Sequence, residues 1–333
     1  MDNKTITLSH GSGGKDSAEL MERVFAKYFS NEILDRMEDG AVLEIGQSRL
    51  VTSTDSFVVT PVEFKGGDIG KLSICGTVND LLMMGAVPKY ITCGFIIEEG
   101  LEIKKLERIV KSTAQTAEKA GVLIVAGDTK VIDKSGDQSG LFINTTGIGA
   151  LPDHRNISAG NCVDGDAIIV SGNLGDHHAC ILSARMDIQN DIQSDCAVLA
   201  PITDSLYEKG IDVHTMRDVT RGGLGTVLNE IADSSDVSIE ISEELIPVDQ
   251  EVKGFCGIMG LDPLYMGNEG KMIVVVRGQD ADKALDIIRT TELGQDATII
   301  GYAKSGKGVF SKTGIGGTRK IDLLYGEGLP RIC

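Results

Sequence analysis

The sequence predicts a mixed α/β protein of two domains, and three observations support this. Strand-like and helix-like segments alternate along both halves of the chain. The length of 333 residues is what about two domains of roughly 150 residues require. A polar, glycine-containing stretch at 152–165 separates the halves. We therefore expect domains at 1–155 and 156–324, followed by a mobile tail at 325–333 that carries two glycines and a proline.

The N-terminal segment predicts a helix followed by a β-hairpin. Asp16 or Ser17 is expected to cap the helix, because the apolar residues that follow recur at helical spacing. Two short apolar runs at 42–45 and 50–54 flank a polar turn. That pattern is typical of a hairpin, and this one is expected to end at Asp55.

Glycine and proline mark the ends of the next elements. Gly85 and Pro88 end an apolar helix, and Gly121 closes an amphipathic one. We expect these helices at 70–84 and 102–120, and strands at 90–97, 122–126 and 141–149. The apolar run at 122–126 predicts a buried strand that leads directly into Gly127.

The second half repeats the mixture of strands and helices. We expect a strand at 167–171, helices at 176–185 and 196–208, a helix after Gly222-Gly223, and strands near Val237, Met272 and Ala297.

The composition excludes several classes of protein. With 41% hydrophobic and 24% charged residues, the chain is globular rather than disordered. A net charge of −17 and the absence of tryptophan argue against a nucleic-acid-binding protein. No apolar stretch approaches the roughly 18 residues of a membrane span, and the first residues lack a signal pattern. We expect a cytoplasmic protein that binds neither nucleic acid nor membrane.

The seven cysteines form no CxxC pair, which indicates a reducing compartment. Cys75, Cys93 and Cys180 are expected to be small buried apolar residues. Cys333 differs from them because it is the last residue, and so it cannot belong to a prenylation box.

Four aspartates stand in settings that suit a magnesium–phosphate site. Asp55 and Asp128 follow strands, Asp80 lies in an apolar helix, and Asp218 precedes a glycine-containing turn. A carboxylate among apolar residues is costly unless it is paired or metal-bound, and Mg²⁺ prefers oxygen ligands and works with phosphates. A single such aspartate is more commonly a cap or turn residue. Together they favour the metal site, although their spacing leaves open whether they converge.

A glycine-rich segment precedes the first helix. The backbone amides of Gly11, Gly13 and Gly14 could cradle a phosphate, with Lys15 adding a positive charge. The segment meets neither the P-loop nor the dinucleotide-binding pattern, and a flexible linker remains an equally good interpretation. Lys130 and Glu269, taken singly, would be solvated surface charges.

Motifs along the whole chain resemble the HypE family, the carbamoyl dehydratases of [NiFe]-hydrogenase maturation. They are HGSGGK at 10–15, TDSFVVTP at 54–61, GTVNDLLMMGAVP at 76–88, AGDTKV at 126–131, MRDVTRGGLGTVLNEIA at 216–232, GNEGK at 267–271 and the terminal PRIC. The internal motifs specify an ATP-dependent superfamily that includes aminoimidazole ribonucleotide synthetase and selenophosphate synthetase. The terminal Pro-Arg-Ile-Cys specifies the member. A selenophosphate synthetase would be expected to carry a cysteine or selenocysteine in the loop where this chain has Ser12.

The resemblance implies a PurM-like fold with ATP near the interface of a homodimer, whose N-terminal domains pair into a β-barrel. The resemblance also implies a chemistry on Cys333, which would receive a carbamoyl group from a HypF-type carbamoyltransferase. ATP would convert the thiocarboxamide to a thiocyanate, and the cyano group would pass to iron on a HypC–HypD complex.

The resemblance gives each candidate residue a role. Glu269 would accept the N–H proton, and Lys130 would polarise the carbamoyl oxygen or pair with Glu269. The residues that would hold Mg²⁺ are Asp55, Asp80, Asp128 and Asp218. Those expected around the ATP phosphates are Gly11, Gly13, Gly14, Lys15 and Thr129, together with Asp55, Asp80 and Asp128.

Three alternatives remain. The chain could be another enzyme of this superfamily that phosphorylates a small molecule or an amide, but such an enzyme would not need Cys333. It could be a nucleotide-responsive scaffold that docks maturation partners without turning ATP over. It could also be a redox-active tail protein, for which the four aspartate motifs would have no task.

Overall fold

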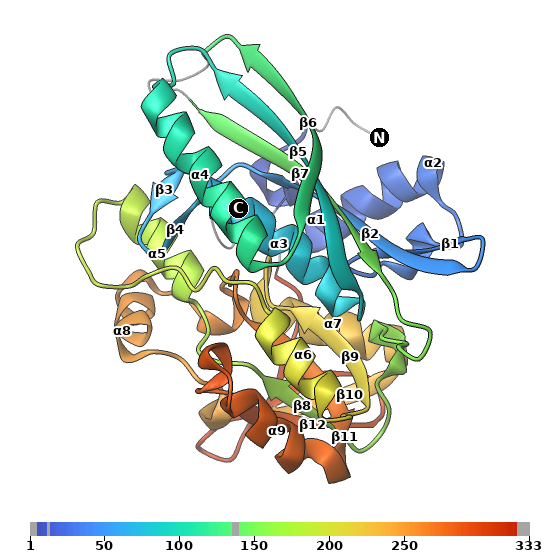
Figure 1. The fold of residues 1–333 in the computed structure, drawn as a ribbon. Helices are drawn as coiled ribbons and strands as arrows, with labels where there is room; N and C mark the ends of the chain where they lie inside the picture. The colour runs from blue at the N-terminus through green and yellow to red at the C-terminus, as the bar shows by residue number, and fades with distance from the viewer. Residues whose placement is uncertain (1–4, 12–13, 135–139, 325–333) are drawn as a thin grey trace.

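The computed structural model describes residues 5–11, 14–134 and 140–324. Its two main sheets come from consecutive halves of the chain (Figure 1). The first has the strand order β1-β2-β7-β5-β6, and the second has the order β14-β13-β10-β12-β8-β11-β9. Helices pack against both sheets, so the mixed α/β prediction is confirmed.

The first half follows the predicted elements closely. Its strands are β1 (Ala41–Ile45), β2 (Ser48–Phe57), β3 (Glu63–Phe64), β4 (Gly67–Asp68), β5 (Val87–Glu98), β6 (Leu123–Ile132) and β7 (Leu141–Ala150), and its helices are α1 (Lys15–Leu20), α2 (Lys27–Phe29), α3 (Ile69–Met83) and α4 (Ile103–Lys119). The predicted cap is wrong: α1 begins at Lys15, and Gly14 precedes it without a side-chain cap. The hairpin is confirmed, but β2 continues two residues beyond Asp55.

The second half also contains every predicted element. Its strands are β8 (Asp166–Val170), β9 (Val213–Asp218), β10 (Val237–Ser242), β11 (Met272–Arg277), β12 (Thr298–Ser305), β13 (Gly308–Lys312) and β14 (Thr318–Ile321), and its helices are α5 (Asp176–Arg185), α6 (Ala200–Glu208), α7 (Gly223–Ser235), α8 (Gln250–Met259) and α9 (Ala281–Arg289). The helix expected from residue 196 begins four residues later, because side-chain hydrogen bonds hold the preceding residues in irregular structure.

Helix α3 lies between the two sheets. Thirteen of its 15 residues are buried, as expected for a helix that is apolar all round. It contacts β2 and β7 of the first sheet, and β9 and α6 of the second half. Ile74 and Val78 of α3 share one hydrophobic cluster with Ile169 and Met216 of the second sheet. Polar residues of α3, such as Asp80, are therefore placed where the two halves meet.

Strand β6 is an open edge of the first sheet. The sequence predicted a buried strand here, but every residue of β6 is exposed, including Val125 at 55% and Val131 at 68%. The strand also continues through Gly127 to Ile132, so Asp128 lies within it rather than after it. Because β1 is the opposite edge, the described residues of one chain form an open sheet, not a closed barrel.

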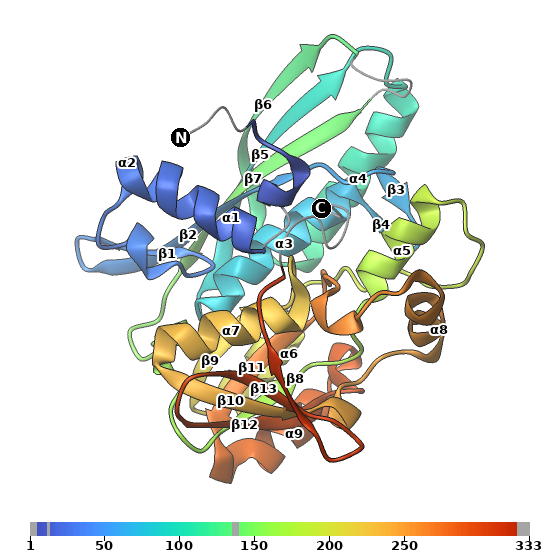
Figure 2. The same ribbon diagram turned by 180° about the vertical axis from the view of Figure 1, so that it is seen from behind.

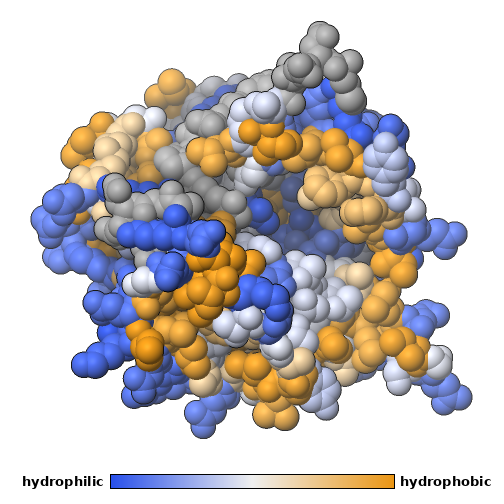
Figure 3. Space-filling view, turned by 90° about the horizontal axis from the view of Figure 1, so that it is seen from above, coloured by the Kyte–Doolittle hydropathy of each residue, from blue (hydrophilic) through white to orange (hydrophobic). Residues whose placement is uncertain are grey.

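The two faces of the first sheet have different coverings. Helices α3 and α4 pack together on one side, while α1 and α2 lie on the other side, nearer the viewer when the molecule is seen from behind (Figure 2). Seen from above, the surface has a hollow with a hydrophilic interior, bordered by hydrophobic residues (Figure 3). A hollow of this kind suits a charged ligand.

The environments of the cysteines match the prediction. Cys75, Cys93 and Cys180 are buried free thiols, as are the other cysteines of the described ranges. Cys333 lies outside the described residues. No helix in the described parts of the chain is both long enough and apolar enough to span a membrane.

Candidate active site

The structure brings three of the four predicted aspartates together from both halves of the chain. Asp55 on β2 points to the α3 side of the sheet, where a Cβ at Gly76 would lie 3.7 Å from its Oδ2. Asp80 of α3 accepts a hydrogen bond of 2.5 Å from the hydroxyl of Ser53. Asp218 ends β9 and is 8% exposed.

These three carboxyl groups repel one another. Burial raises the pKa of Asp80 well above its usual value, and the charges of Asp218 and Asp55 add to the shift. Burial also raises the pKa of Asp218 to about 6, against the opposing effect of Arg217 and with a contribution from Asp55. Each group thus makes ionisation of the others more costly, and a bound cation would offset that cost.

The cluster fits Mg²⁺ held jointly with phosphate. Carboxylate oxygens are suitable ligands, and Mg²⁺ is commonly bound by one or two carboxylates plus phosphates and waters. Within the described residues, no group of three or more histidine, cysteine, aspartate or glutamate side chains is close enough to hold a metal ion by itself. The oxygens of a phosphate ligand would therefore complete the coordination.

Glu269 belongs to the same site. It lies three residues before the start of β11 and is 4% exposed. Burial raises its pKa well above the usual value, followed by the charges of Asp218 and Asp55, while Arg221 opposes the shift. A buried glutamate beside a set of aspartates has the surroundings of a proton-transfer group.

Asp128 and Lys130 lie on the opposite face of the first sheet. Cross-strand partners share a face, and the register aligns Asp55 with Thr145 and Thr145 with Cys93, all on the α3 side. Asp128 is paired with Gly94, one residue farther along, so it points the other way. Its carboxylate is 2.8 Å from the Lys130 ammonium, and this hydrogen bond lowers its pKa. Within one chain, the structure does not bring this pair to Asp55.

Thr129 lies between Asp128 and Lys130 on β6, so its side chain points to the opposite face from theirs, the α3 side.

The glycine-rich segment lies beside the end of the described chain. The amide of Lys15 donates a hydrogen bond of 3.1 Å to the carbonyl of Leu324. A Cβ at Gly14 would be 2.6 Å from that oxygen, whereas one at Gly11 would meet nothing within 4 Å. Gly13, like Cys333, lies outside the described residues.

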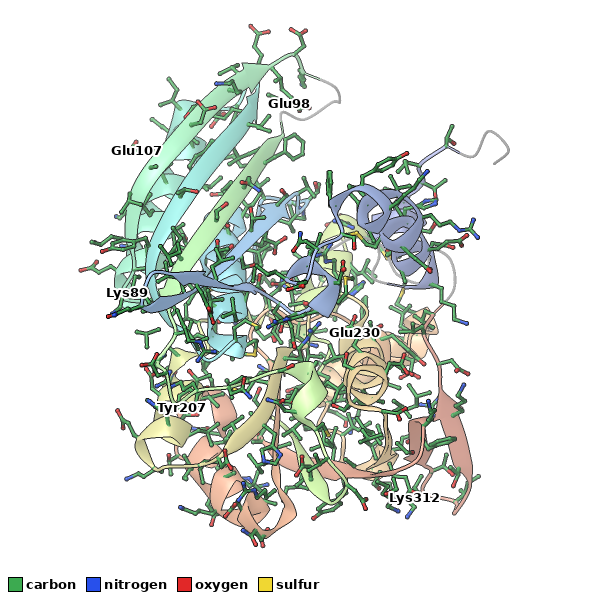
Figure 4. The ribbon with its side chains drawn as sticks, turned by 90° about the vertical axis from the view of Figure 1, so that its right-hand side faces the viewer. Lys89, Glu98, Glu107, Tyr207, Glu230 and Lys312 are labelled. Atoms are coloured by element: carbon green, nitrogen blue, oxygen red, sulfur yellow. The ribbon has the colours of Figure 1, made fainter. Side chains whose placement is uncertain are left out.

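Sequence reasoning missed a charged network around Asp218. Arg217 pairs with Asp39 at 3.1 Å and with Glu230 at 2.7 Å. Burial raises the pKa of Asp39 well above its usual value, although Arg217 opposes the shift. Figure 4 shows Glu230 at the junction of the two halves. The position of Arg217 next to Asp218 was a usable signal, whereas nothing near Asp39 in the sequence indicated this role.

Comparisons with known proteins identify the family. Residues 37–151 match the model of the AIR synthase related protein N-terminal domain, and residues 163–313 match that of the C-terminal domain. The chain is 45% identical to the carbamoyl dehydratase HypE of Rhodobacter capsulatus, over 98% of each chain. It is 44% identical to that of Escherichia coli K12, over 98% of this chain and 99% of the relative.

Solved structures agree with the sequence relatives. A chain in a crystal structure of a HypE–HypF complex superposes with a TM-score of 0.86 at 46% identity, covering 92% of this chain and 99% of that one. HypE in complex with ATP has a TM-score of 0.82 at 43% identity, covering 99% and 100%. The likeness extends at 18% identity to thiamine monophosphate kinase of Aquifex aeolicus, with a TM-score of 0.67 over 91% and 97%, which shows the shared two-domain PurM-like fold alone. The chain belongs to the AIR synthase related family and, within it, to the HypE carbamoyl dehydratases.

Proposed function

We propose that this chain dehydrates a carbamoyl group carried on the sulfur of Cys333 to a thiocyanate, at the expense of ATP. The product supplies the cyanide ligand of the [NiFe]-hydrogenase iron. The observation that carries the proposal is the meeting of Asp55, Asp80 and Asp218 with the buried Glu269. Relatives that cover the whole chain are named carbamoyl dehydratases, and one was solved with ATP.

The chemistry explains why the site needs both the aspartates and the buried glutamate. Loss of water from S–C(=O)–NH₂ requires a leaving group better than hydroxide. The carbonyl oxygen attacks the γ-phosphate, ADP leaves, and loss of one of the two N–H protons to solvent gives an imidate phosphate. Removal of the remaining N–H proton and departure of phosphate then leave S–C≡N. The net change is thiocarboxamide plus ATP to thiocyanate, ADP and phosphate.

Each candidate residue has a role in this reaction. Asp55, Asp80 and Asp218 would hold Mg²⁺, and its charge would offset that of the phosphates. The amides of Gly11, Gly13 and Gly14, with Lys15, cover the phosphates. Glu269 takes the nitrogen proton, and its burial keeps water away from the reacting group.

A second copy of the chain completes the site. Asp128 and Lys130 face away from Asp55 in their own chain, so we assign them to the neighbour's site. The exposed apolar side chains of β6, such as Val125 and Val131, form the interface. Two open sheets paired along this edge would close the β-barrel, and burial of these side chains would stabilise it.

A complementation experiment tests this arrangement. An Asp80→Asn chain and a Lys130→Ala chain are each expected to be inactive alone. In a mixed dimer, one of the two sites would combine both changes and the other would carry neither. When equal amounts of the two chains exchange subunits at random, about half of the dimers are mixed, and each mixed dimer has one intact site of its two. The mixture should therefore recover about a quarter of wild-type activity. No recovery from exchanged mixtures would show that Lys130 acts within its own chain.

The tail and the partners complete the cycle. A HypF-type carbamoyltransferase loads Cys333, in keeping with the HypE–HypF complex of a relative, and a HypC–HypD complex receives the cyano group. Residues 325–333 could reach at most about 30 Å when extended, starting from Leu324 beside Lys15. The test is the stoichiometry: one phosphate should be released for each carbamoyl group lost from Cys333. ATP hydrolysis that is independent of carbamoylation would contradict the proposal.

A further inference from the structure

We infer that Asp195 is a positioning residue for Glu269. It belongs to residues 194–199, a segment that we name the strap. The carboxylate of Asp195 accepts the amide N–H of Glu269 at 3.1 Å through Oδ1, and that of Gly270 at 3.2 Å through Oδ2. Its side chain is 2% exposed. Charge-assisted hydrogen bonds to two consecutive amides fix the backbone at Glu269 and Gly270.

The opposite side of that peptide is also held. The carbonyl of Glu269 accepts the amide of Ala197 at 3.3 Å. A Cβ at Gly270 would lie 2.0 Å from the carbonyl oxygen of Asp195, so only glycine permits this approach. The Lys271 ammonium lies 3.6 Å from Asp195 Oδ2 and supplies the opposite charge that a buried carboxylate needs. Glu269 therefore has little freedom to move relative to the strap.

The strap is tied in turn to helix α3. The Asn79 side chain donates to the carbonyl of Ala197 at 3.0 Å and accepts the amide of Leu199 at 2.9 Å. Asn79 is 2% exposed and directly precedes Asp80 in the chain. The strap thus connects the helix that carries Asp80 to the loop that carries Glu269, although these two residues belong to different halves of the molecule.

This connection has a consequence for the reaction. Phosphoryl transfer takes place at the aspartates and proton removal at Glu269, so the two events require a fixed separation. The inference rests on the proposed function of Glu269. In Asp195→Asn, an NH₂ group replaces one of the two carboxylate oxygens, so one of the two backbone N–H groups faces a donor instead of its acceptor, and the charge that pairs with Lys271 is lost. Displacements of about 1 Å can cost about 100-fold, so we expect kcat for dehydration to fall roughly 10- to 100-fold, with the KM for ATP within about twofold.

The test is a double-mutant cycle on the full chain, loaded by its carbamoyltransferase and supplied with MgATP. Asp195→Asn, Glu269→Gln and the double variant are compared. If Asp195 acts through Glu269, the double variant will be no slower than Glu269→Gln alone. Multiplied losses, or an Asp195→Asn variant as fast as wild type, would overturn the inference. A Glu269→Gln variant that keeps the wild-type rate would instead overturn the proposed role of Glu269.

Asp166→Asn is the matched control. Asp166 is 2% exposed, accepts a backbone amide from Val163 at 2.9 Å, and lies 2.7 Å from Nδ1 of the His214 ring. It opens β8, at the end away from Ser171 and the loop before β11. We expect it to lose thermal stability while keeping its kcat. An equal loss of kcat in both variants would assign the effect to stability and overturn the inference. If Asp195→Asn does not fold, Lys271→Gln should show a smaller loss with the same non-additivity.

Discussion

The amide of Lys15 hydrogen-bonds to the carbonyl of Leu324 at 3.1 Å, and so joins the glycine-rich segment to the last residue described before the tail. Leu324 lies beside the residues proposed to cover the ATP phosphates. Leu324 therefore sets the point from which Cys333 must reach the site.

Gly14→Ala should slow dehydration by about tenfold or more. A Cβ at Gly14 would lie 2.6 Å from the Leu324 carbonyl, so the tail would have to leave from a displaced position. Single-turnover conversion of carbamoylated protein measures the effect. Gly11→Ala, whose Cβ would meet nothing within 4 Å, should lose less. Equal losses in the two variants would count against a role for the contact with Leu324.

Asp80→Asn should stabilise the protein in the absence of Mg²⁺ and weaken its binding of MgATP. The buried Asp80 carboxylate is opposed by Asp218 and Asp55, while an asparagine oxygen could still accept the Ser53 hydroxyl. We expect a gain on the order of 1 kcal/mol in the free energy of unfolding in chelator, and at least about tenfold weaker binding by calorimetry. A less stable variant that binds MgATP normally would contradict the proposed cluster.

His178 should make the protein less stable in acid. Burial lowers the pKa of His178 to about 3, with smaller contributions from His177 and Arg185. Its Nδ1 accepts the amide of Gly267 at 3.3 Å, and its Nε2 has no partner among the described residues. In the unfolded chain the His178 ring binds a proton with a pKa near 6.5, whereas in the folded chain it stays neutral until the pH approaches 3. Stability should therefore be complete above pH 6.5 and fall progressively from there toward pH 3.

The His178→Asn variant tests this sign. Asparagine keeps an acceptor for the Gly267 amide but cannot titrate. Urea denaturation at pH 7 and pH 5 should show that wild type loses about 2 kcal/mol more than the variant, at about 1.4 kcal/mol for each pH unit below 6.5. The same loss in both proteins would show that other groups control acid stability.

Val125→Asp should separate the proposed dimer and slow dehydration. Val125 is 55% exposed on the edge strand β6, and a charge there would oppose burial against a second copy. Sedimentation should give the mass of one chain for the variant and two for wild type. Ile258→Asp, which changes an isoleucine 86% exposed on α8, is the control and should leave both the mass and the rate as in wild type. A wild-type protein with the mass of one chain would contradict the proposed interface.

Local sequence signals predicted most helices and strands, because nearby residues decide where such an element begins and ends. Helix α3 was recognised from an apolar segment that ends at Gly85, which has a positive φ of 75° suited to glycine. Strand β6 shows where such signals fail. Its apolar run predicted burial, but hydrophobicity does not say whether a strand is covered by its own chain or by another one.

The site was only partly predictable for the same reason. The aspartates and Glu269 belong to recognisable motifs, but their meeting depends on α3 lying between two sheets. Nothing local distinguishes Asp195 from the polar residues around it, because its role comes from amides 74 and 75 positions farther along the chain. Asp128 likewise followed a strand signal, and only the register shows that it faces away from Asp55.

The most direct test of the central claim follows the carbamoyl oxygen. Cys333 would be loaded with a carbamoyl group labelled with ¹⁸O in its carbonyl, and the protein would then receive unlabelled MgATP in unlabelled water. If the oxygen is phosphorylated before it leaves, mass spectrometry will find the label in the released phosphate, with one ¹⁸O for each thiocyanate formed on Cys333. Label that appears in water, or that stays on Cys333 while ATP is hydrolysed, would contradict the account.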